Sequence, residues 1–247
     1  MRTNVLVPSA GTSEFFKDSY YPKILIEVDG KPMVQRIVEE YQSISNVHYI
    51  FLLREEECRK FHTDSIVRLL TDSNCDVIRI HGNTKGALCT ALLAVDYIDN
   101  DDKLIIVNND ELRDVNYREL MDYYEEKKAD AGVISFENYH PRWTYIRTEG
   151  DYVVEVAEKK PISQNAITGF YYYRQGKYFV ESAKRRIRKR NLINVVYYVS
   201  GSINEMILQN QKVAYYQIAN EAYHSLYSME KINSYEKWRS QNENRKN

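Results

Sequence analysis

Cysteine is scarce in this sequence, and the few cysteines have no spacing that gives them a joint role. The 247 residues contain three, Cys58, Cys75 and Cys89, which are scattered and form no CxxC pair. The simplest interpretation is that they are small hydrophobic side chains in a reducing compartment. No secretory segment precedes the first strand-like run. We therefore expect a cytoplasmic protein.

Long apolar runs, internal repeats and strong net charge are also missing. No apolar stretch approaches the roughly 20 residues that span a bilayer, and no linker rich in Pro, Gly or Ser divides the chain. The formal net charge is −1, so no overall field would hold the protein on nucleic acid or on a membrane. With 43% hydrophobic and 28% charged residues, the composition is that of a globular protein. Partners must therefore be sought in local sites.

The first half of the chain alternates strand-like and helix-like runs. Apolar, strand-like segments occupy residues 4–10, 47–53, 76–81 and 103–107. Helical periodicity covers residues 34–41, a polar stretch up to about Asp72, and a buried run at 86–95. Strands that alternate with helices through short links predict crossover connections and a mostly parallel sheet flanked by helices.

The second half is richer in strands. Segments 144–148 and 152–159 are separated by Glu149, Gly150 and Asp151, a hairpin signal. Further elements follow in the order strand, helix, helix and strand, at residues 166–173, 178–189, 203–209 and 213–218. We expect a single domain over residues 1–238, with halves 1–135 and 136–238 and a smaller β-rich lobe in the second. Residues 239–247 form a polar tail that is expected to fray.

The loop after the first strand is a candidate phosphate site. It reads Pro-Ser-Ala-Gly-Thr-Ser over residues 8–13, with Pro22 and Lys23 downstream. A small-residue loop at the carboxyl edge of a parallel sheet exposes backbone N–H groups, which favour phosphate oxygens. A lysine about a dozen residues later would add a positive charge. A glycine after a strand is more often only a turn, so this loop carries little weight alone.

A second candidate is the acidic segment Asn108-Asn109-Asp110-Glu111, directly after strand 103–107. A carboxylate at the carboxyl end of a central strand is well placed to hold a hard cation through oxygen. The competing interpretation is that Asp110 caps the helix expected from about Tyr117.

The third candidate is Glu158-Lys159-Lys160-Pro161, at the end of a strand. Its carboxylate and ammonium groups could accept a hydroxyl and pair with a phosphate, although such clusters are usually solvated strand ends. The basic run at residues 184–190 closes a helical segment, where cations favour the helix C-terminus, so we expect no nucleic-acid partner.

Taken together and in order, these segments resemble the sugar-phosphate nucleotidyltransferase family, of the GT-A-like pyrophosphorylase type. The closest likeness is to short capsule-locus members, including CTP-dependent cytidylyltransferases of phosphorylated small molecules. The resemblance runs from Val5 to about Lys231. It rests on NVLVPSAG, YPKILIEVDGKPMVQ, NTKGALCTALLA, LIIVNND, PRWTYIRT, VVEVAEKKPIS, ITGFYYY and INEMI. The joint occurrence of TKGA, NND and EVAEKKPIS is much more specific than any one segment.

The resemblance implies a Rossmann-like sheet with a nucleoside triphosphate across its carboxyl edge and a phosphorylated small-molecule acceptor beside it. Residues 1–135 would form the nucleotide-binding half and 136–238 the acceptor-binding half. It implies roles for two catalytic residues: Lys23 neutralises phosphate, and Asp110 holds Mg²⁺. The implied nucleotide-binding residues are Ala10, Gly11, Thr12, Thr84, Lys85, Gly86 and Ala87. The implied acceptor-binding residues are Glu158, Lys159 and Gly169.

Two departures from the family pattern concern charge. The family's phosphate loop carries an arginine where this chain has Glu14, which would repel phosphate unless it turns away or binds a metal; Lys17 or Lys31 is a possible substitute. The family's other metal-binding aspartate should fall near His224-Ser225, where no acid is present. Glu221 or Glu205 is then a candidate ligand, unless Asp110 and substrate phosphates suffice.

The resemblance predicts a Mg²⁺-dependent enzyme of EC 2.7.7 type that releases pyrophosphate, with CTP favoured and UTP or dTTP open. Capsule or surface polysaccharide assembly is the expected pathway, and an oligomer is possible. Two alternatives stay open. Glu14 motivates a nucleotide-binding protein with weakened catalysis. A glycosyltransferase with the same sheet would use a preformed nucleotide sugar, but EVAEKKPIS and PKIL match the pyrophosphorylase-like branch better.

Overall fold

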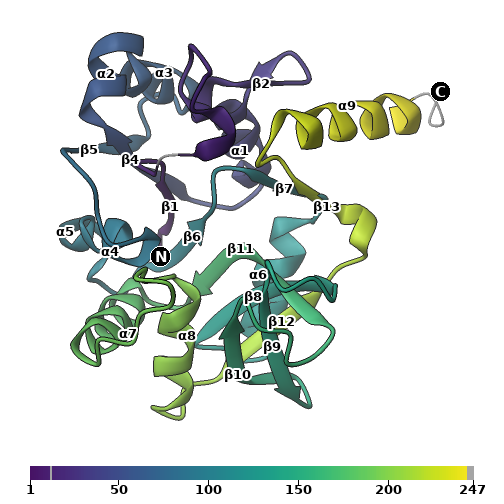
Figure 1. The fold of residues 1–247 in the computed structure, drawn as a ribbon. Helices are drawn as coiled ribbons and strands as arrows, with labels where there is room; N and C mark the ends of the chain where they lie inside the picture. The colour runs from purple at the N-terminus through teal and green to yellow at the C-terminus, as the bar shows by residue number, and fades with distance from the viewer. Residues whose placement is uncertain (12, 244–247) are drawn as a thin grey trace.

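A single mixed sheet of nine strands forms the centre of the molecule (Figure 1). The computed structural model describes residues 1–11 and 13–243. The strands are β1 (Thr3–Pro8), β4 (Val47–Arg54), β5 (Cys75–Ile80), β6 (Lys103–Val107), β8 (Ala131–Glu137), β9 (Thr144–Glu149), β10 (Tyr152–Glu158), β11 (Asn165–Tyr173) and β12 (Val213–Gln217). Their order in space is β5-β4-β1-β6-β11-β8-β12-β10-β9.

The first four strands of this order, β5, β4, β1 and β6, are all parallel, as the alternating pattern predicts. Val5 of β1 pairs with Tyr49 on one side and with Ile105 on the other. Successive side chains of a strand point to opposite faces. Accordingly, Val5 and Val7 join one core cluster while Leu6 joins another, and all three are fully buried. Both faces of this half are therefore covered.

The strands of the second half extend the same sheet with mixed directions. β11 runs antiparallel to both β6 and β8, whereas β12 is parallel to β8. β9 and β10 form the expected hairpin, in which Tyr152 pairs with Glu149. The turn contains Gly150, whose φ of 57° lies in the left-handed region that glycine adopts at little cost. The predicted α/β fold is confirmed, and its β-rich part is continuous with the main sheet.

Helices cover both faces. They are α1 (Met33–Tyr41), α2 (Glu55–Phe61), α3 (Thr63–Leu70), α4 (Ala87–Leu92), α5 (Val95–Ile98), α6 (Tyr117–Glu126), α7 (Gly176–Arg188), α8 (Ser200–Ile207) and α9 (Met229–Glu243). Side chains from α1, α3, α6 and α9 enter one core cluster, and those of α4, α7 and α8 enter the other. Figure 1 shows α4, α5, α7 and α8 on the opposite side of the sheet from α1 to α3. No helix among the described residues is long and apolar enough to cross a membrane.

Smaller elements surround the carboxyl edge of the sheet. They are the 3₁₀ helices η1 (Glu14–Phe16), η2 (Lys23–Leu25) and η3 (Asn220–Ala222), the pair β2 (Glu27–Val28) and β3 (Lys31–Pro32), and the pair β7 (Glu111–Arg113) and β13 (Tyr223–Ser225). The chain end differs from expectation. Residues 239–247 were expected to fray, but those up to Glu243 continue α9, which buries Ile232 near its start.

Candidate active site

The acidic segment after β6 is a tight connection to β7, and most of its side chains are held inward. Asn108 donates from Nδ2 to Glu111 Oε1 at 2.8 Å, and buried Asn109 donates from Nδ2 to Ser9 Oγ at 3.0 Å. The Leu226 N–H donates to the Asp110 backbone carbonyl at 2.7 Å. The segment is thus tied to the loop after β1 through Asn109 and to the C-terminal part of the chain through Asp110. The Asp110 carboxylate itself pairs with a side chain from another element.

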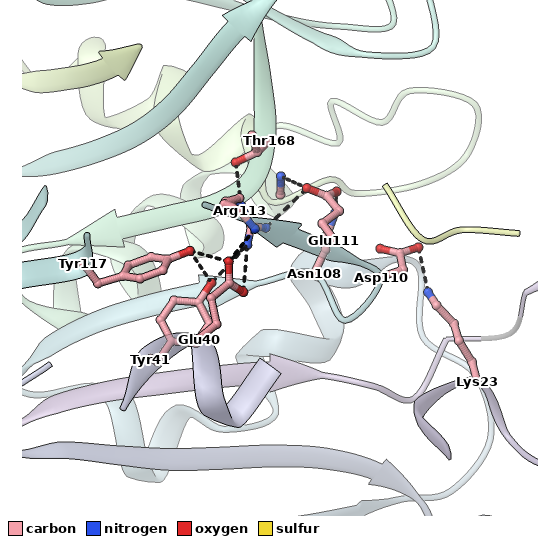
Figure 2. Close-up of polar contacts among 10 residues, drawn as sticks. Lys23, Glu40, Tyr41, Asn108, Asp110, Glu111, Arg113, Tyr117 and Thr168 are labelled. Carbon is pink, nitrogen blue, oxygen red and sulfur yellow. Dashed lines mark hydrogen bonds and ion pairs between the residues drawn. The ribbon is translucent and has the colours of Figure 1, made fainter. Parts of the chain in front are cut away.

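That partner is Lys23, on η2. Its ammonium lies 2.8 Å from Asp110 Oδ2, and both side chains are partly buried. Figure 2 shows this pair apart from the larger cluster around Arg113. The two residues that the resemblance names as catalytic therefore lie together, although 87 positions separate them. An ammonium bound to this carboxylate occupies the place where a metal cation would be attracted.

Glu111 points the other way, into the protein. Its Oε2 accepts the Gly169 N–H at 2.7 Å and lies 3.3 Å from Arg113 Nη2. Gly169 also accepts the Asn108 N–H at 2.8 Å through its carbonyl. A Cβ at position 169 would lie 2.1 Å from Asn108 Nδ2, so any larger residue there would force the Asn108 side chain to move. Glu111 and Gly169 together hold the acidic connection against β11.

Behind Glu111, the buried guanidinium of Arg113 joins four elements (Figure 2). It donates to Thr168 Oγ1 on β11 at 3.1 Å and to the Tyr41 hydroxyl on α1 at 3.1 Å. It lies 3.3 Å from Glu40 Oε1, which also accepts the Tyr117 hydroxyl of α6 at 2.6 Å. Burial raises the pKa of Glu40, and the attraction of Arg113 and the hydrogen bond from Tyr117 offset this only in part.

A cavity of about 600 Å³, here called the central cavity, opens over the Lys23–Asp110 pair. The hydroxyl, charged and aromatic side chains that line it come from well-separated parts of the chain. They are Ser13, Glu14, Phe15, Lys23, Asn108, Asp110, Glu111, Arg142, Trp143, Ser225 and Tyr227. A second cavity of about 510 Å³, the loop cavity, shares Ser13, Glu14 and Lys23 with it and extends past Gly11 to Lys60.

On the other side lies a smaller cavity of about 220 Å³, the hairpin cavity. Glu158, Lys159 and Gly169 all line it, so the structure brings the three predicted acceptor residues together. Glu158 Oε2 accepts from Thr144 Oγ1 at 2.5 Å and from Ser200 Oγ at 2.7 Å. The hydroxyl of Tyr198 raises the pKa of Lys159, which therefore stays charged.

The TKGA segment is held against residues 193–198. Gly86 has a φ of 111°, and a Cβ there would lie 2.5 Å from the Tyr197 carbonyl oxygen. The Lys85 carbonyl accepts the Tyr197 N–H at 2.8 Å. The Thr84 hydroxyl lies 2.6 Å from that of Thr90, and the Lys85 side chain is exposed. Ala87 begins α4 and lines the hairpin cavity.

In the phosphate loop, Ala10 is buried and Gly11 is exposed at the loop cavity, whereas Thr12 lies outside the described residues. Glu14 lines both the central and the loop cavities with a side chain that is 89% exposed. Lys17 also lines the loop cavity, and its Nζ lies 3.9 Å from Glu14 Oε2.

Lys31 is bound elsewhere. It lies on β3, pairs with Glu39 of α1 at 2.7 Å and lines neither the central nor the loop cavity. Carboxylates that could hold a metal with Asp110 are few. Glu205 is buried and pairs with Lys189 at 2.6 Å, while Ser225 occupies the wall of the central cavity. Among the described residues, no group of three or more His, Cys, Asp or Glu side chains could hold a metal.

Two features escaped prediction from the sequence. Arg142 and Trp143 line both the central and the hairpin cavities, yet the sequence marks them only as part of a resembling segment.

The alternative that Asp110 caps a helix is wrong. Asn116 caps α6 instead, and its side chain accepts the N–H groups of Arg118 and Glu119.

Residues 18–239 match the nucleotidyl transferase family. The chain belongs to this family. It is therefore a nucleotidyltransferase, as the sequence resemblance predicts. No curated protein matches the chain.

Solved structures share the fold at low identity. A nucleoside-diphosphate-sugar pyrophosphorylase from Vibrio cholerae superposes with a TM-score of 0.79 at 18% identity, over 94% of this chain and 99% of that one. A UDP-glucose pyrophosphorylase complexed with UDP-glucose gives 0.78 at 16%, over 98% and 100%. An inositol-1-phosphate CTP transferase from T. maritima gives 0.75 at 12%, over 96% and 94%. At these identities the likeness concerns the fold.

Proposed function

We propose that this nucleotidyltransferase joins a nucleoside triphosphate, CTP by preference, to a phosphorylated sugar, polyol or amino-acid derivative and releases pyrophosphate. The observation that carries the proposal is the Lys23–Asp110 pair at 2.8 Å, in a cavity that shares a wall with the predicted acceptor site. The solved inositol-1-phosphate CTP transferase has the same fold, which is compatible with CTP. A role in capsule or surface polysaccharide assembly follows from the sequence resemblance, and a cytoplasmic location from the scattered cysteines.

In this proposal the triphosphate lies along the loop after β1, with its phosphates at Lys23. Residues 84–87 contact base and ribose. The acceptor occupies the hairpin cavity, where Glu158 accepts a hydroxyl and Lys159 supplies a fixed positive charge. An acceptor phosphate oxygen attacks the α-phosphorus in line, and pyrophosphate leaves. Because both reactants are anions, the protein's work is alignment and charge neutralisation rather than nucleophilic catalysis.

Asp110 is the protein ligand that would hold a hard divalent cation here, with the remaining ligands supplied by the substrates. Asp110 supplies a carboxylate at the cavity, and phosphate oxygens of the substrates supply further hard ligands, the pattern that Mg²⁺ favours. The sequence resemblance likewise implies Mg²⁺ at Asp110. Bound there, Mg²⁺ would neutralise charge on the phosphates. The Lys23 ammonium would then leave Asp110 and pair with a phosphate oxygen instead.

The test is pyrophosphate release with Mg²⁺, each nucleoside triphosphate in turn, and a panel of phosphorylated sugars, polyols and amino acids. We expect one pair of substrates to react and Asp110→Ala to lower kcat by at least about a hundredfold, as for the loss of one preorganised charge partner. Asp101→Ala is the matched control. Asp101 precedes the opposite end of the same strand, with a side chain that is 71% exposed.

Equal rates for Asp110→Ala and wild type would contradict the proposed role. Triphosphate binding in calorimetry with no pyrophosphate from any pair would favour the alternative of weakened catalysis, which Glu14 motivates. Transfer from a preformed nucleotide sugar, with no pyrophosphate, would instead identify a glycosyltransferase.

A further inference from the structure

The reaction proposed above, on which this inference rests, sets a geometric requirement for the acceptor. Its body lies in the hairpin cavity, while its phosphate must reach the α-phosphorus in the central cavity. The phosphate therefore passes the wall that the two cavities share. Four residues line both cavities: Asn108, Glu111, Arg142 and Trp143.

Of these four side chains, only Arg142 can neutralise a phosphate. Asn108 has its amide N–H on Glu111, and Trp143 is uncharged. Glu111 is an acid, but its oxygens are already engaged by the Gly169 N–H, by Asn108 and by Arg113. These contacts, above all the one with Arg113, remove much of the repulsion that Glu111 would exert on a phosphate. It leaves the guanidinium of Arg142 as the cation at the junction.

The surroundings of Arg142 fit a phosphate-binding group rather than a structural ion pair. Its Nη1 donates to the Tyr227 hydroxyl at 3.0 Å, and its guanidinium stacks 4.3 Å from the Trp143 ring and 5.3 Å from the Tyr227 ring. Within residues 1–11 and 13–243, no carboxylate lies within ion-pair distance of it. Two aromatic rings and a phenol hold the side chain without cancelling its charge.

We propose that Arg142 binds the acceptor's phosphate and directs it at the α-phosphorus. The guanidinium donates to two non-attacking oxygens of that phosphate. The third oxygen forms the new bond to the α-phosphorus, while the bond between the α-phosphorus and the bridging oxygen breaks and pyrophosphate leaves with its electron pair. Arg142 thus supplies, from the acceptor side, a positive charge that the loop with Glu14 lacks.

The kinetic test compares Arg142→Ala, Arg142→Lys and wild type in pyrophosphate release. Loss of a charge-assisted bidentate contact should raise the acceptor's KM by about ten- to a hundredfold, while the KM for the triphosphate changes little. Arg142→Lys should recover only part of this loss, because an ammonium keeps the charge without the two-pronged geometry. The matched control is Arg147→Ala, an arginine of the same hairpin that pairs with Glu155 at 2.7 Å. It should behave as wild type.

A second measurement needs no turnover. The chain has two tryptophans, Trp143 and Trp238, so Trp238→Phe leaves the indole that stacks on Arg142 as the sole reporter. Inorganic phosphate should change its fluorescence saturably, and adding Arg142→Ala should abolish the response. Tyr227→Phe, which removes the phenol that holds Nη1, should weaken the response by a few fold.

An unchanged acceptor KM in Arg142→Ala would overturn the proposal, as would a phosphate response that is absent from the start or survives this substitution. Failure of the broader function is a separate result. If no substrate pair releases pyrophosphate from wild type, the fluorescence titration still decides whether Arg142 binds phosphate.

Discussion

At the scale of single residues, one glycine controls the geometry of the acidic connection. Gly169 donates its N–H to Glu111 and accepts that of Asn108, and the Asn108 side chain fills the space where a Cβ would be. A glycine within a strand is usually a weak point, but it is required where another group approaches closely. The sequence resemblance names Gly169 as an acceptor residue. The structure adds a packing reason for glycine at this position.

Gly169→Ala should therefore destabilise the protein by about 1–3 kcal/mol through overpacking and should lower activity as well, because Asn108 must move. Gly11→Ala is a suitable comparison, since a Cβ there meets nothing within 4 Å. Its free energy of unfolding should stay close to that of wild type. Urea unfolding of both variants checks this, and equal stabilities would show that the Asn108 side chain yields easily.

Glu40 illustrates a residue whose burial has a measurable consequence. Its carboxyl is buried beside Arg113, and burial raises its pKa above the ordinary value. A carboxyl whose pKa is higher in the folded than in the unfolded state contributes stability that is present below the unfolded pKa. That contribution is lost as pH rises through the folded pKa.

Relative to Glu40→Gln, wild type should therefore lose stability as pH rises from the ordinary carboxyl range through the raised pKa of Glu40. Glutamine is uncharged throughout, so its free energy of unfolding lacks this component. Urea unfolding of both proteins at a series of pH values gives the difference. A difference that grows in favour of wild type with rising pH would mean that Arg113 outweighs burial and lowers the pKa.

At the scale of elements, the C-terminal segment braces the site from outside the main sheet. β13 pairs antiparallel with β7, placing His224 opposite Leu112, and Leu226 donates to the Asp110 carbonyl. α9 follows at once and is anchored by Ile232, which is 1% exposed. Figure 1 shows α9 extending away from the sheet. The position of Asp110 thus depends on how the last helix is attached.

Ile232→Ala should cost about 2–5 kcal/mol, the usual range for truncating a buried isoleucine. It should also lower pyrophosphate release, because the brace on Asp110 loosens. Lys237→Ala, an exposed position on the same helix, should change neither property. Thermal unfolding and the pyrophosphate assay check both variants. Full activity in a destabilised Ile232→Ala protein would show that α9 supports the fold without supporting the site.

At the scale of the whole molecule, the site lies where the parallel half of the sheet meets the antiparallel strand β11. β6 is the last parallel strand of the first half, and the acidic connection follows it directly. The central cavity therefore receives residues from the loop after β1, from the connection after β6, from the loop before β9 and from β13. Ligands of open α/β sheets bind at such carboxyl edges. Each cavity wall is supplied by a different part of the chain.

The sequence by itself determined the elements and the kinds of chemistry they carry. Runs such as 47–53 and 103–107 are apolar and short, so they became buried strands within a residue or so of the prediction. An acid directly after such a strand must lie at the sheet's carboxyl edge, which is why Asp110 could be named in advance. Local patterns suffice here because strand geometry and burial depend on near neighbours.

Only the tertiary structure decided which of these residues meet and which way they point. Lys23 reaches Asp110 across 87 positions, and Arg113 reaches Thr168 across 55. Asp110 and Glu111 are adjacent acids, yet one faces the cavity and the other the buried guanidinium. Arg142 carries no local signal, because its importance comes from a wall shared by two cavities. Such contacts depend on strand order and helix packing, which no local pattern contains.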